Sequence, residues 1–248
     1  MRLKNKKALV IGGSSGIGLS IAEGFAAEGA RLGIIGRRQE KLDAALASLR
    51  KQNDDAIALT ADMRGAKACR EAIDKITAAL GGLDILVNSQ GITVVKPSAE
   101  MTEAEYLSVI DTDLNSVFFS CQAAYKHMRG KGGSIISIAS LAGHRGWPLA
   151  APYAASKHGV LAITKTLATE WASEKIRVNS ISPGYFHTEL TSTLKPERVQ
   201  LATSRTPMGR FGELPELQGA AVFLASEDAT YVTGADIAVD GGFLGKGL

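Results

Sequence analysis

The amino-acid sequence predicts an α/β protein with one doubly wound parallel sheet of about seven strands and helices on both faces. Short apolar runs alternate with longer segments of helical periodicity along the chain, and repeated β–α units of this kind form parallel sheets. The short runs are apolar throughout, so both faces of each strand should be covered. No linker rich in Pro, Gly or Ser interrupts the 248 residues, and a single domain is therefore expected.

The expected elements follow one another in order along the chain. Strands are expected at residues 8–11, 31–35, 56–60, 83–87, 134–138, 176–181 and 236–239. Helices are expected at residues 16–28, 39–50, 66–80, 103–128, 152–173 and 215–225. A less regular segment, residues 184–213, precedes the last helix and is expected to form a lid over bound substrate. Ligands of such a sheet bind at the carboxyl ends of its strands, where the strand order switches direction.

The composition is ordinary for a soluble globular protein, and the partner expected for this chain is a small-molecule substrate. The chain is 45% hydrophobic and 21% charged, and its net charge of +3 is too small to favour nucleic acid or an anionic membrane surface. No run reaches the roughly 20 apolar residues of a membrane span, and no signal-peptide core follows the basic N-terminus. The two cysteines, Cys69 and Cys121, form no metal-type cluster and are expected to be buried thiols. A cytoplasmic location without a metal site is expected.

A glycine-rich turn joins the first strand to the first helix. Its sequence, Gly-Gly-Ser-Ser-Gly-Ile-Gly over residues 12–18, has the spacing Gly-x-x-x-Gly-x-Gly. Glycines let a pyrophosphate approach main-chain N–H groups, and the positive end of the helix dipole favours an anion there. This Rossmann-type arrangement predicts a nucleotide held by Gly12, Ser14, Ser15, Gly16, Ile17 and Gly18.

Two arginines follow the second strand and bear on the choice of cofactor. An acidic residue at this strand end would accept a hydrogen bond from the ribose 2′-hydroxyl of NAD. Here Gly36 is followed by Arg37 and Arg38, which would instead attract a 2′-phosphate. NADP(H) is therefore the expected cofactor, with NAD(H) as the alternative and two solvated surface arginines as the non-functional interpretation.

A tyrosine and a lysine four residues apart predict acid–base chemistry. Tyr153 and Lys157 share one face of the helix expected at residues 152–173. The lysine ammonium would stabilise the ionised form of the phenol, as a general base working near neutral pH requires. Ser140 ends the preceding strand at the carboxyl edge of the sheet, where its hydroxyl could bind a substrate oxygen.

Over essentially its whole length the chain resembles the short-chain dehydrogenase/reductase family in its basic single-domain form. The matching pieces are residues 12–18, Asp62, residues 83–88, Ser140, residues 153–157, Asn179, Pro183-Gly184 and residues 239–242. The resemblance implies that Tyr153 is the general acid/base, that Ser140 orients the substrate oxygen, and that Lys157 binds the nicotinamide ribose. It also implies hydride transfer between a carbonyl and a secondary alcohol, and a homotetramer as in many relatives.

The resemblance further assigns residues to the cofactor site. Asp62 would contact the adenine and Asn88 would line the site, while the turn at Pro183-Gly184 would hold the nicotinamide together with Thr188. The neighbouring residues counted with this site are Met63, Gly91 and Phe186.

Asp113 departs from the pattern of the family. The resemblance places a catalytic asparagine at this position, where it holds a water in a proton relay to the lysine. An ionised aspartate accepts hydrogen bonds but cannot donate them, and it adds negative charge near the relay. Asp113 is interpreted as a tolerated substitute within the catalytic set, although it also leaves open a protein that binds cofactor in a regulatory role without turnover.

Three stretches, residues 168–172, 183–190 and 205–212, resemble sugar-acid and polyol members of the gluconate 5-dehydrogenase kind. His144, Arg145 and Trp147 follow Ser140, and Tyr185 and His187 follow Pro183-Gly184. With Ser140 and Tyr153, these side chains are the candidate contacts of a polyhydroxy or carboxylated substrate. The alternative enzyme is a 3-oxoacyl-carrier-protein reductase, which would need a basic docking patch at the pocket mouth, with Arg129, Lys131 and Arg210 as candidates.

Overall fold

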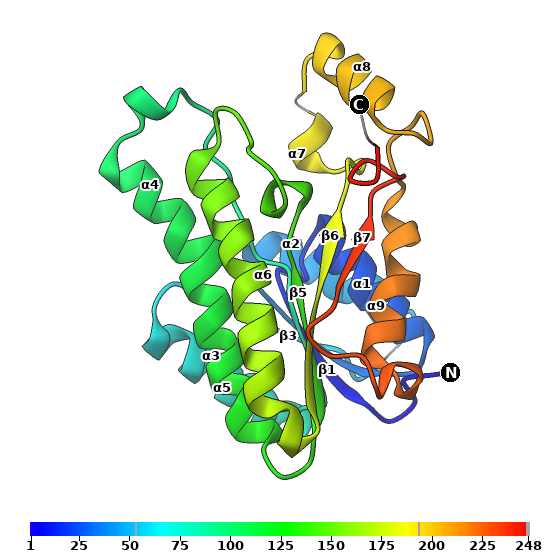
Figure 1. The fold of residues 1–248 in the computed structure, drawn as a ribbon. Helices are drawn as coiled ribbons and strands as arrows, with labels where there is room; N and C mark the ends of the chain where they lie inside the picture. Colours follow the sequence, from blue (N-terminus) through cyan, green and yellow to red (C-terminus); the bar gives the residue numbers. More distant parts are fainter. Residues whose placement is uncertain (53, 193, 247–248) are drawn as a thin grey trace.

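The structure is a computed structural model that describes residues 1–52, 54–192 and 194–246. Residues 53 and 247–248 lie outside the described residues, as does residue 193 of the expected lid. The chain forms a seven-stranded sheet with the strand order β3-β2-β1-β4-β5-β6-β7, and every neighbouring pair is parallel (Figure 1). The predicted doubly wound single-domain fold is confirmed.

The strands lie close to their expected positions. Their bounds are β1 (Lys7–Ile11), β2 (Arg31–Gly36), β3 (Ile57–Thr60), β4 (Ile85–Asn88), β5 (Gly133–Ile138), β6 (Ile176–Pro183) and β7 (Asp236–Val239). Because β1 pairs with β2 on one side and with β4 on the other, the strand order changes direction beside β1. This switch point places the turn after β1 next to the turn after β4, at the carboxyl edge of the sheet.

Helices cover both faces of the sheet. One face carries α1 (Gly16–Ala27), α2 (Gln39–Leu49) and α9 (Gln218–Ala225), and the other carries α3 (Ala66–Leu80), α5 (Ser116–Met128) and α6 (Ala151–Trp171) (Figure 1). In β1 the side chains of Ala8 and Val10 pack into the first core and those of Leu9 and Ile11 into the second. All four are at most 1% exposed, which explains why the strand is apolar throughout.

The long helix expected at residues 103–128 is interrupted. It consists of α4 (Glu103–Ile110), a π-helical turn at Asp111–Asn115 and α5. Thr102 begins α4 with a capping box, in which its side chain accepts from the Glu105 N–H and the Glu105 carboxylate accepts from the Thr102 N–H. The π turn, a feature often found at functional sites, carries Asp113 inward.

The described residues of the segment expected to be irregular form two short helices. These are α7 (Glu189–Ser192) and α8 (Pro196–Arg205), and Figure 1 shows them above the carboxyl edge of the sheet. Pro196 at the start of α8 fits the first turn of a helix, where a missing N–H costs nothing. None of the helices among the described residues is long and apolar enough to cross a membrane.

Candidate active site

A cavity of about 890 Å³ lies along the carboxyl ends of the strands. Most of the residues expected to bind cofactor or perform catalysis line it together. They are Gly12, Ser14, Ser15, Gly16, Ile17, Gly18, Arg37, Arg38, Asp62, Met63, Gly91, Ser140, Tyr153, Lys157, Pro183, Gly184, Phe186 and Thr188. The remaining predicted residues, Asn88, Asp113, His144, Trp147, Tyr185 and His187, are outside this lining.

The glycine-rich turn has the geometry of a cradle that side chains would obstruct. A Cβ on Gly12 would lie 2.7 Å from the carbonyl group of Ser89, and a Cβ on Gly18 would lie 2.3 Å from the carbonyl oxygen of Gly12. A Cβ on Gly16 would meet no atom within 4 Å, so this glycine faces open space. Within the described residues the side chain of Ser15 does not cap α1. The first N–H groups of the helix are thus presented to the cavity, as an anion site requires.

Ser140, Tyr153 and Lys157 come from two neighbouring elements at the same cavity. Ser140 follows β5, and its hydroxyl accepts a hydrogen bond of 3.2 Å from the Ala142 N–H. Tyr153 and Lys157 lie one turn apart on α6, with the lysine Nζ 5.5 Å from the centre of the tyrosine ring. The predicted pairing of these residues on one helix face is therefore present in the structure.

Lys157 is fixed by two groups below the cavity surface. Its Nζ donates to the carbonyl oxygen of Ile138 at 3.0 Å and lies 3.5 Å from Oδ2 of Asp113. Asp113 is 0% exposed, and its Oδ1 accepts from the Ile92 N–H at 2.8 Å. Burial raises the pKa of Asp113, and the Lys157 ammonium opposes that increase. Asp113 therefore acts on Lys157 from beneath and does not itself line the cavity.

The arginines at the strand ends surround the expected adenosine side. Arg37 and Arg38 both line the cavity, and both are exposed. Asp62 is held by Arg64, whose Nη2 and Nε lie 2.6 and 2.9 Å from its Oδ2. Arg64 lowers the pKa of Asp62 by this contact. Arg64 also lines the cavity but was not predicted as a site residue. Its position two residues after Asp62, just beyond the end of a strand, could have indicated it.

Asn88 lies beneath the cavity floor. It is 1% exposed, and its amide donates to Sγ of Cys121 and to Oγ of Ser137. The lining at this point is formed by the residues that follow it, including Gln90, whose amide donates to Oγ of Ser116 at 2.9 Å. Gln90 was not predicted as a site residue.

An aromatic group stands beside the cavity on the substrate side. Tyr185 stacks on Phe211 with ring centres 5.3 Å apart, meets Phe243 edge-on at 5.9 Å and lies 6.1 Å from Trp147. Burial raises the pKa of Tyr185. His187 also lies against Phe211, at 5.3 Å. Because Gly184 and Phe186, the chain neighbours of Tyr185, line the cavity, the aromatic group lies directly beside the cavity rim.

His144 is turned toward the edge of the sheet. Its Nε2 lies 3.0 Å from Oγ of Ser182 and 3.0 Å from Oδ2 of Asp236, which begins β7. The same aspartate accepts from the hydroxyl of Ser180 at 2.6 Å. This arrangement fixes the loop after Ser140 to β6 and β7, and His144 does not line the cavity.

Comparison with known proteins matches these features to a large enzyme family. The family described as enoyl-(acyl carrier protein) reductase matches residues 11–244. Gluconate 5-dehydrogenase of Gluconobacter oxydans is 37% identical over 243 residues, covering 97% of this chain and 95% of that protein. A 3-oxoacyl-[acyl-carrier-protein] reductase of Chlamydia trachomatis is 38% identical over 242 residues, covering 97% of this chain and 98% of that protein.

A solved structure extends the similarity to three dimensions. The crystal structure of a gluconate 5-dehydrogenase from Burkholderia cenocepacia in complex with NADP and tartrate has a TM-score of 0.95 to this chain. The two sequences are 36% identical, and the match covers 99% of this chain and 98% of that one. The similarity thus includes the whole sheet and the segments at its carboxyl edge.

Proposed function

The chain belongs to the short-chain dehydrogenase/reductase family and is an oxidoreductase, and from this premise we propose that it interconverts a carbonyl and a secondary alcohol by using NADP(H). The observation that carries the proposal is that Ser140, Tyr153 and Lys157 line the same cavity as the glycine-rich turn. A dinucleotide bound along the strand ends would therefore reach from the arginines to the acid–base pair.

The glycine-rich turn supports the fit of a dinucleotide. At Gly12 and Gly18 the backbone packs so closely against other backbone atoms that no side chain would fit. Gly16 instead faces the cavity, so the first N–H groups of α1 are accessible. These groups would hold the pyrophosphate, and the helix dipole adds roughly half a positive charge there. When bound, the nicotinamide supplies or accepts the hydride.

The chain's own residues would manage the proton and the substrate oxygen. Tyr153 donates a proton to the oxygen as the carbonyl is reduced and recovers it as the alcohol is oxidised. Ser140 donates a hydrogen bond to the same oxygen and stabilises the developing negative charge. Lys157, fixed by Ile138 and Asp113, holds the ribose and favours the ionised phenol. The retention of all three groups supports turnover over a purely regulatory role.

The two exposed arginines support NADP(H) over NAD(H). Arg37 and Arg38 are at the cavity where the adenosine ribose would lie, and no acidic residue occupies the end of β2. A 2′-phosphate would gain charge-assisted hydrogen bonds from them. The related Burkholderia enzyme was solved with NADP.

The proposed substrate is a sugar acid, ketose or polyol. Gluconate 5-dehydrogenases are among the relatives by sequence and by structure, and the aromatic group around Tyr185 offers flat apolar faces beside polar tips. The 3-oxoacyl-carrier-protein reductase remains the second candidate because such an enzyme is equally similar in sequence.

The charged residues weigh against a carrier-protein docking patch. Arg129 and Lys131 lie between α5 and β5, at the amino edge of the sheet, and Arg129 is 3.7 Å from the Glu174 carboxylate. Arg210 is paired with Glu216 at 2.6 Å. The three candidates therefore do not form one unpaired basic surface at the cavity mouth. We accordingly prefer a sugar acid, ketose or polyol as substrate over an acyl group on a carrier protein.

We further propose that residues 184–213 close over the substrate and that the enzyme is a cytoplasmic homotetramer. The cavity lining supplied by Gly184, Phe186, Thr188, Glu189 and Thr191 supports the role of this segment as a lid. Light scattering of the purified protein would measure the mass of the assembly directly.

A substrate panel tests the proposed function. Keto-sugar acids, ketoses, polyols and acetoacetyl thioesters should each be assayed with NADPH or NADH, or with the oxidised cofactors, by absorbance of the reduced nicotinamide. We expect the highest kcat/KM with a sugar acid or its keto form and NADP(H). A preference for acetoacetyl thioesters would establish the reductase instead, and no turnover with any carbonyl or alcohol would reject the proposal.

A further inference from the structure

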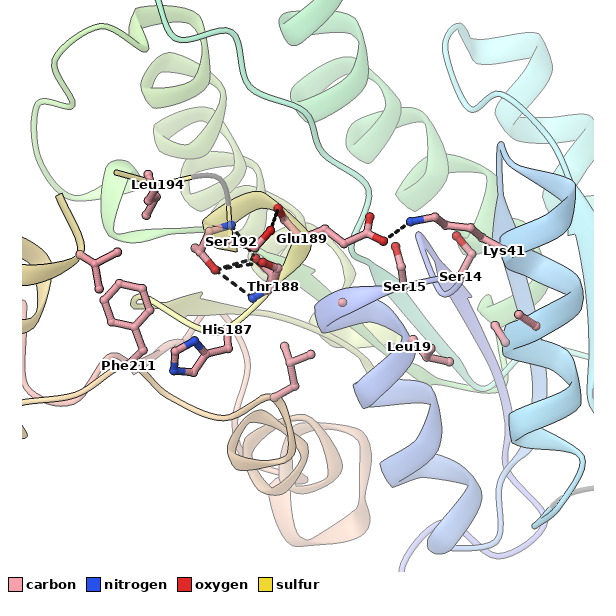
Figure 2. Close-up of a pocket in the computed structure, with 16 residues that line it drawn as sticks. Ser14, Ser15, Leu19, Lys41, His187, Thr188, Glu189, Ser192, Leu194 and Phe211 are labelled. Carbon is pink, nitrogen blue, oxygen red and sulfur yellow. Dashed lines mark hydrogen bonds and ion pairs between the residues drawn. The ribbon is translucent and has the colours of Figure 1, made fainter. Parts of the chain in front are cut away.

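An acidic side chain at the start of α7 bridges to two cations of the α2 segment. Lys41 donates a hydrogen bond from Nζ to Oε1 of Glu189, and Nη2 of Arg38 lies 3.7 Å from Oε2 of the same carboxylate. Figure 2 shows Glu189 reaching from α7 toward Lys41, close to Ser14 and Ser15 of the glycine-rich turn. The contact joins residues 148 positions apart in the chain.

The bridge lies between two cavities. Glu189 lines the dinucleotide cavity and also a neighbouring cavity of about 800 Å³, and both cavities include the serines of the glycine-rich turn. Lys41 is 31% exposed and lines the second cavity, so its stem is partly enclosed. The Lys41 contact lowers the pKa of Glu189, which favours the charged carboxylate. The pair thus crosses from α2 to α7 beside the place proposed for the pyrophosphate.

The turn that carries Glu189 is hydrogen-bonded to residues that line the dinucleotide cavity. Thr191, on the same turn as Glu189, donates to the carbonyl oxygen of Phe186 at 2.7 Å, and its hydroxyl accepts from the Thr188 N–H at 2.9 Å. Phe186 and Thr188 line the dinucleotide cavity. A contact that holds Glu189 against α2 therefore also restrains Phe186 and Thr188, which are expected to contact the nicotinamide end of the cofactor.

We infer that the Lys41–Glu189 pair is a latch that holds α7 across the middle of the bound dinucleotide and slows its release. The inference rests on the proposed function, because it requires a dinucleotide in the cavity, and it assigns Lys41 and Glu189 as positioning residues. Arg38, more distant from Glu189 than Lys41 is, can turn to a 2′-phosphate while Lys41 retains the carboxylate. The latch can then close whether or not the cofactor carries a 2′-phosphate.

Hydrogen exchange in the protein without cofactor tests the latch by itself. We compare the unmodified protein with Lys41→Met and follow a peptide that covers residues 186–192, whose own sequence is unchanged. An exposed or half-exposed ion pair stabilises a contact by a factor of about two to five, so exchange should become faster by that factor. The control is Lys67→Met, which removes another exposed ion pair, to Glu71 on α3. Unchanged exchange in Lys41→Met, or equal acceleration in the control, would overturn the latch.

Cofactor release tests its consequence. NADPH should leave Glu189→Gln and Lys41→Met about two- to fivefold faster than the unmodified protein in stopped-flow displacement. The charge-swapped variant, with Lys41→Glu and Glu189→Lys, should restore the original rate to within about twofold. Adenosine 2′,5′-bisphosphate contains only the adenosine side of the cofactor, so its Kd should not rise in Glu189→Gln.

The outcomes separate the inference from the proposed function. Faster exchange with unchanged NADPH release would mean that the pair holds α7 without retaining cofactor, and the inference would fail. A swapped variant as fast as the single variants, or equal weakening of NADPH and adenosine 2′,5′-bisphosphate, would also reject it. If the unmodified protein binds no NADPH at all, the proposed function fails first, and the exchange experiment still reports whether α7 is latched.

Discussion

Asp113 and Lys157 form a buried ion pair directly beneath the proposed acid–base residue. Oδ2 of Asp113 lies 3.5 Å from Nζ of Lys157, and the two side chains are 0% and 5% exposed. Among the described residues Oδ2 accepts no hydrogen bond, so Lys157 is its main electrostatic partner. An ionised Asp113 therefore offsets part of the positive charge that Lys157 presents to Tyr153.

Replacing Asp113 by asparagine should maintain or raise activity. The amide retains an acceptor for the Ile92 N–H but removes the charge that opposes Lys157. The lysine field at Tyr153 then strengthens, so the acidic limb of the pH–rate profile for alcohol oxidation should move to lower pH, by about one pH unit. Initial rates between pH 5 and 10 measure the shift. A large loss of kcat with intact folding would show that the carboxylate has a catalytic role of its own.

Replacing Tyr153 by phenylalanine should abolish most turnover and preserve cofactor binding. The ring that packs near Lys157 remains, but the group that transfers the proton is lost. We expect kcat to fall roughly 10²- to 10⁴-fold, the usual contribution of a general acid/base. NADPH titration by fluorescence should give a Kd within about threefold of the original. Tyr106→Phe, at an exposed position on α4, is the matched control; substantial activity in Tyr153→Phe would remove Tyr153 from its proposed role.

Joint replacement of Arg37 and Arg38 by alanine should change cofactor preference. The loss of two cations at the expected 2′-phosphate site should raise the KM for NADPH roughly 10- to 100-fold, because charge-assisted hydrogen bonds contribute strongly. The KM for NADH should change little, since NADH lacks the phosphate. Arg70→Ala with Lys75→Ala, at exposed positions on α3, removes the same two charges and controls for net charge. An unchanged ratio of the two KM values would refute the assignment of the phosphate site.

The fold and the centre of the site could be predicted from local signals. The apolar runs predict the strands because parallel strands are covered on both faces. The turn at residues 12–18 and the pair Tyr153 and Lys157 lie at the strand ends, where ligands of such sheets bind. The π turn at Asp111–Asn115 could not be read in this way. Its helical periodicity is locally ordinary, and the inward position of Asp113 is set by Lys157 and Ile92, which lie far away in the sequence.

The directions of two side chains depend on tertiary packing that the sequence does not reveal. Asn88 ends a strand at the right edge, yet its side chain turns down to Cys121 and Ser137 instead of lining the cavity. The contact between Lys41 and Glu189 has no sequence signal, because it depends on how α7 sits over α2. Such relationships follow from tertiary packing and not from composition, period or spacing.

Two glycine variants should separate stability from cofactor binding. In Gly18→Ala the new methyl would lie 2.3 Å from the carbonyl oxygen of Gly12, so we expect a loss of roughly 3 kcal/mol in the free energy of unfolding. Gly16→Ala has no neighbour within 4 Å, but its φ of +54° costs about 1 kcal/mol for alanine, and its methyl faces the cavity. Gly16→Ala should therefore reduce the free energy of NADPH binding by more than it reduces the free energy of unfolding. Urea unfolding and NADPH titration check both; equal stabilities would contradict the close-packing argument.

Replacing Glu105 by glutamine should destabilise the protein in a pH-dependent way. The Thr102 N–H and the Lys96 ammonium lower the pKa of Glu105 to about 2, from an ordinary value of 4.5. A carboxylate with a lowered pKa in the folded state stabilises that state above pH 4.5, and the contribution disappears as pH falls toward 2. Glutamine can still accept from the Thr102 N–H, so the variant loses only the charge and the ion pair with Lys96, and Tm should fall by about 2 °C at pH 7.

The test of Glu105 is a series of thermal unfolding curves between pH 7 and pH 3, followed by circular dichroism. The difference in Tm between Glu105→Gln and the unmodified protein should be constant down to about pH 5 and should then shrink steadily. Glu103→Gln is the matched control, because Glu103 occupies the same first turn of α4 and is exposed. A difference that persists undiminished at pH 3 would mean that the charge of Glu105 does not stabilise the cap, and that glutamine disturbs it sterically.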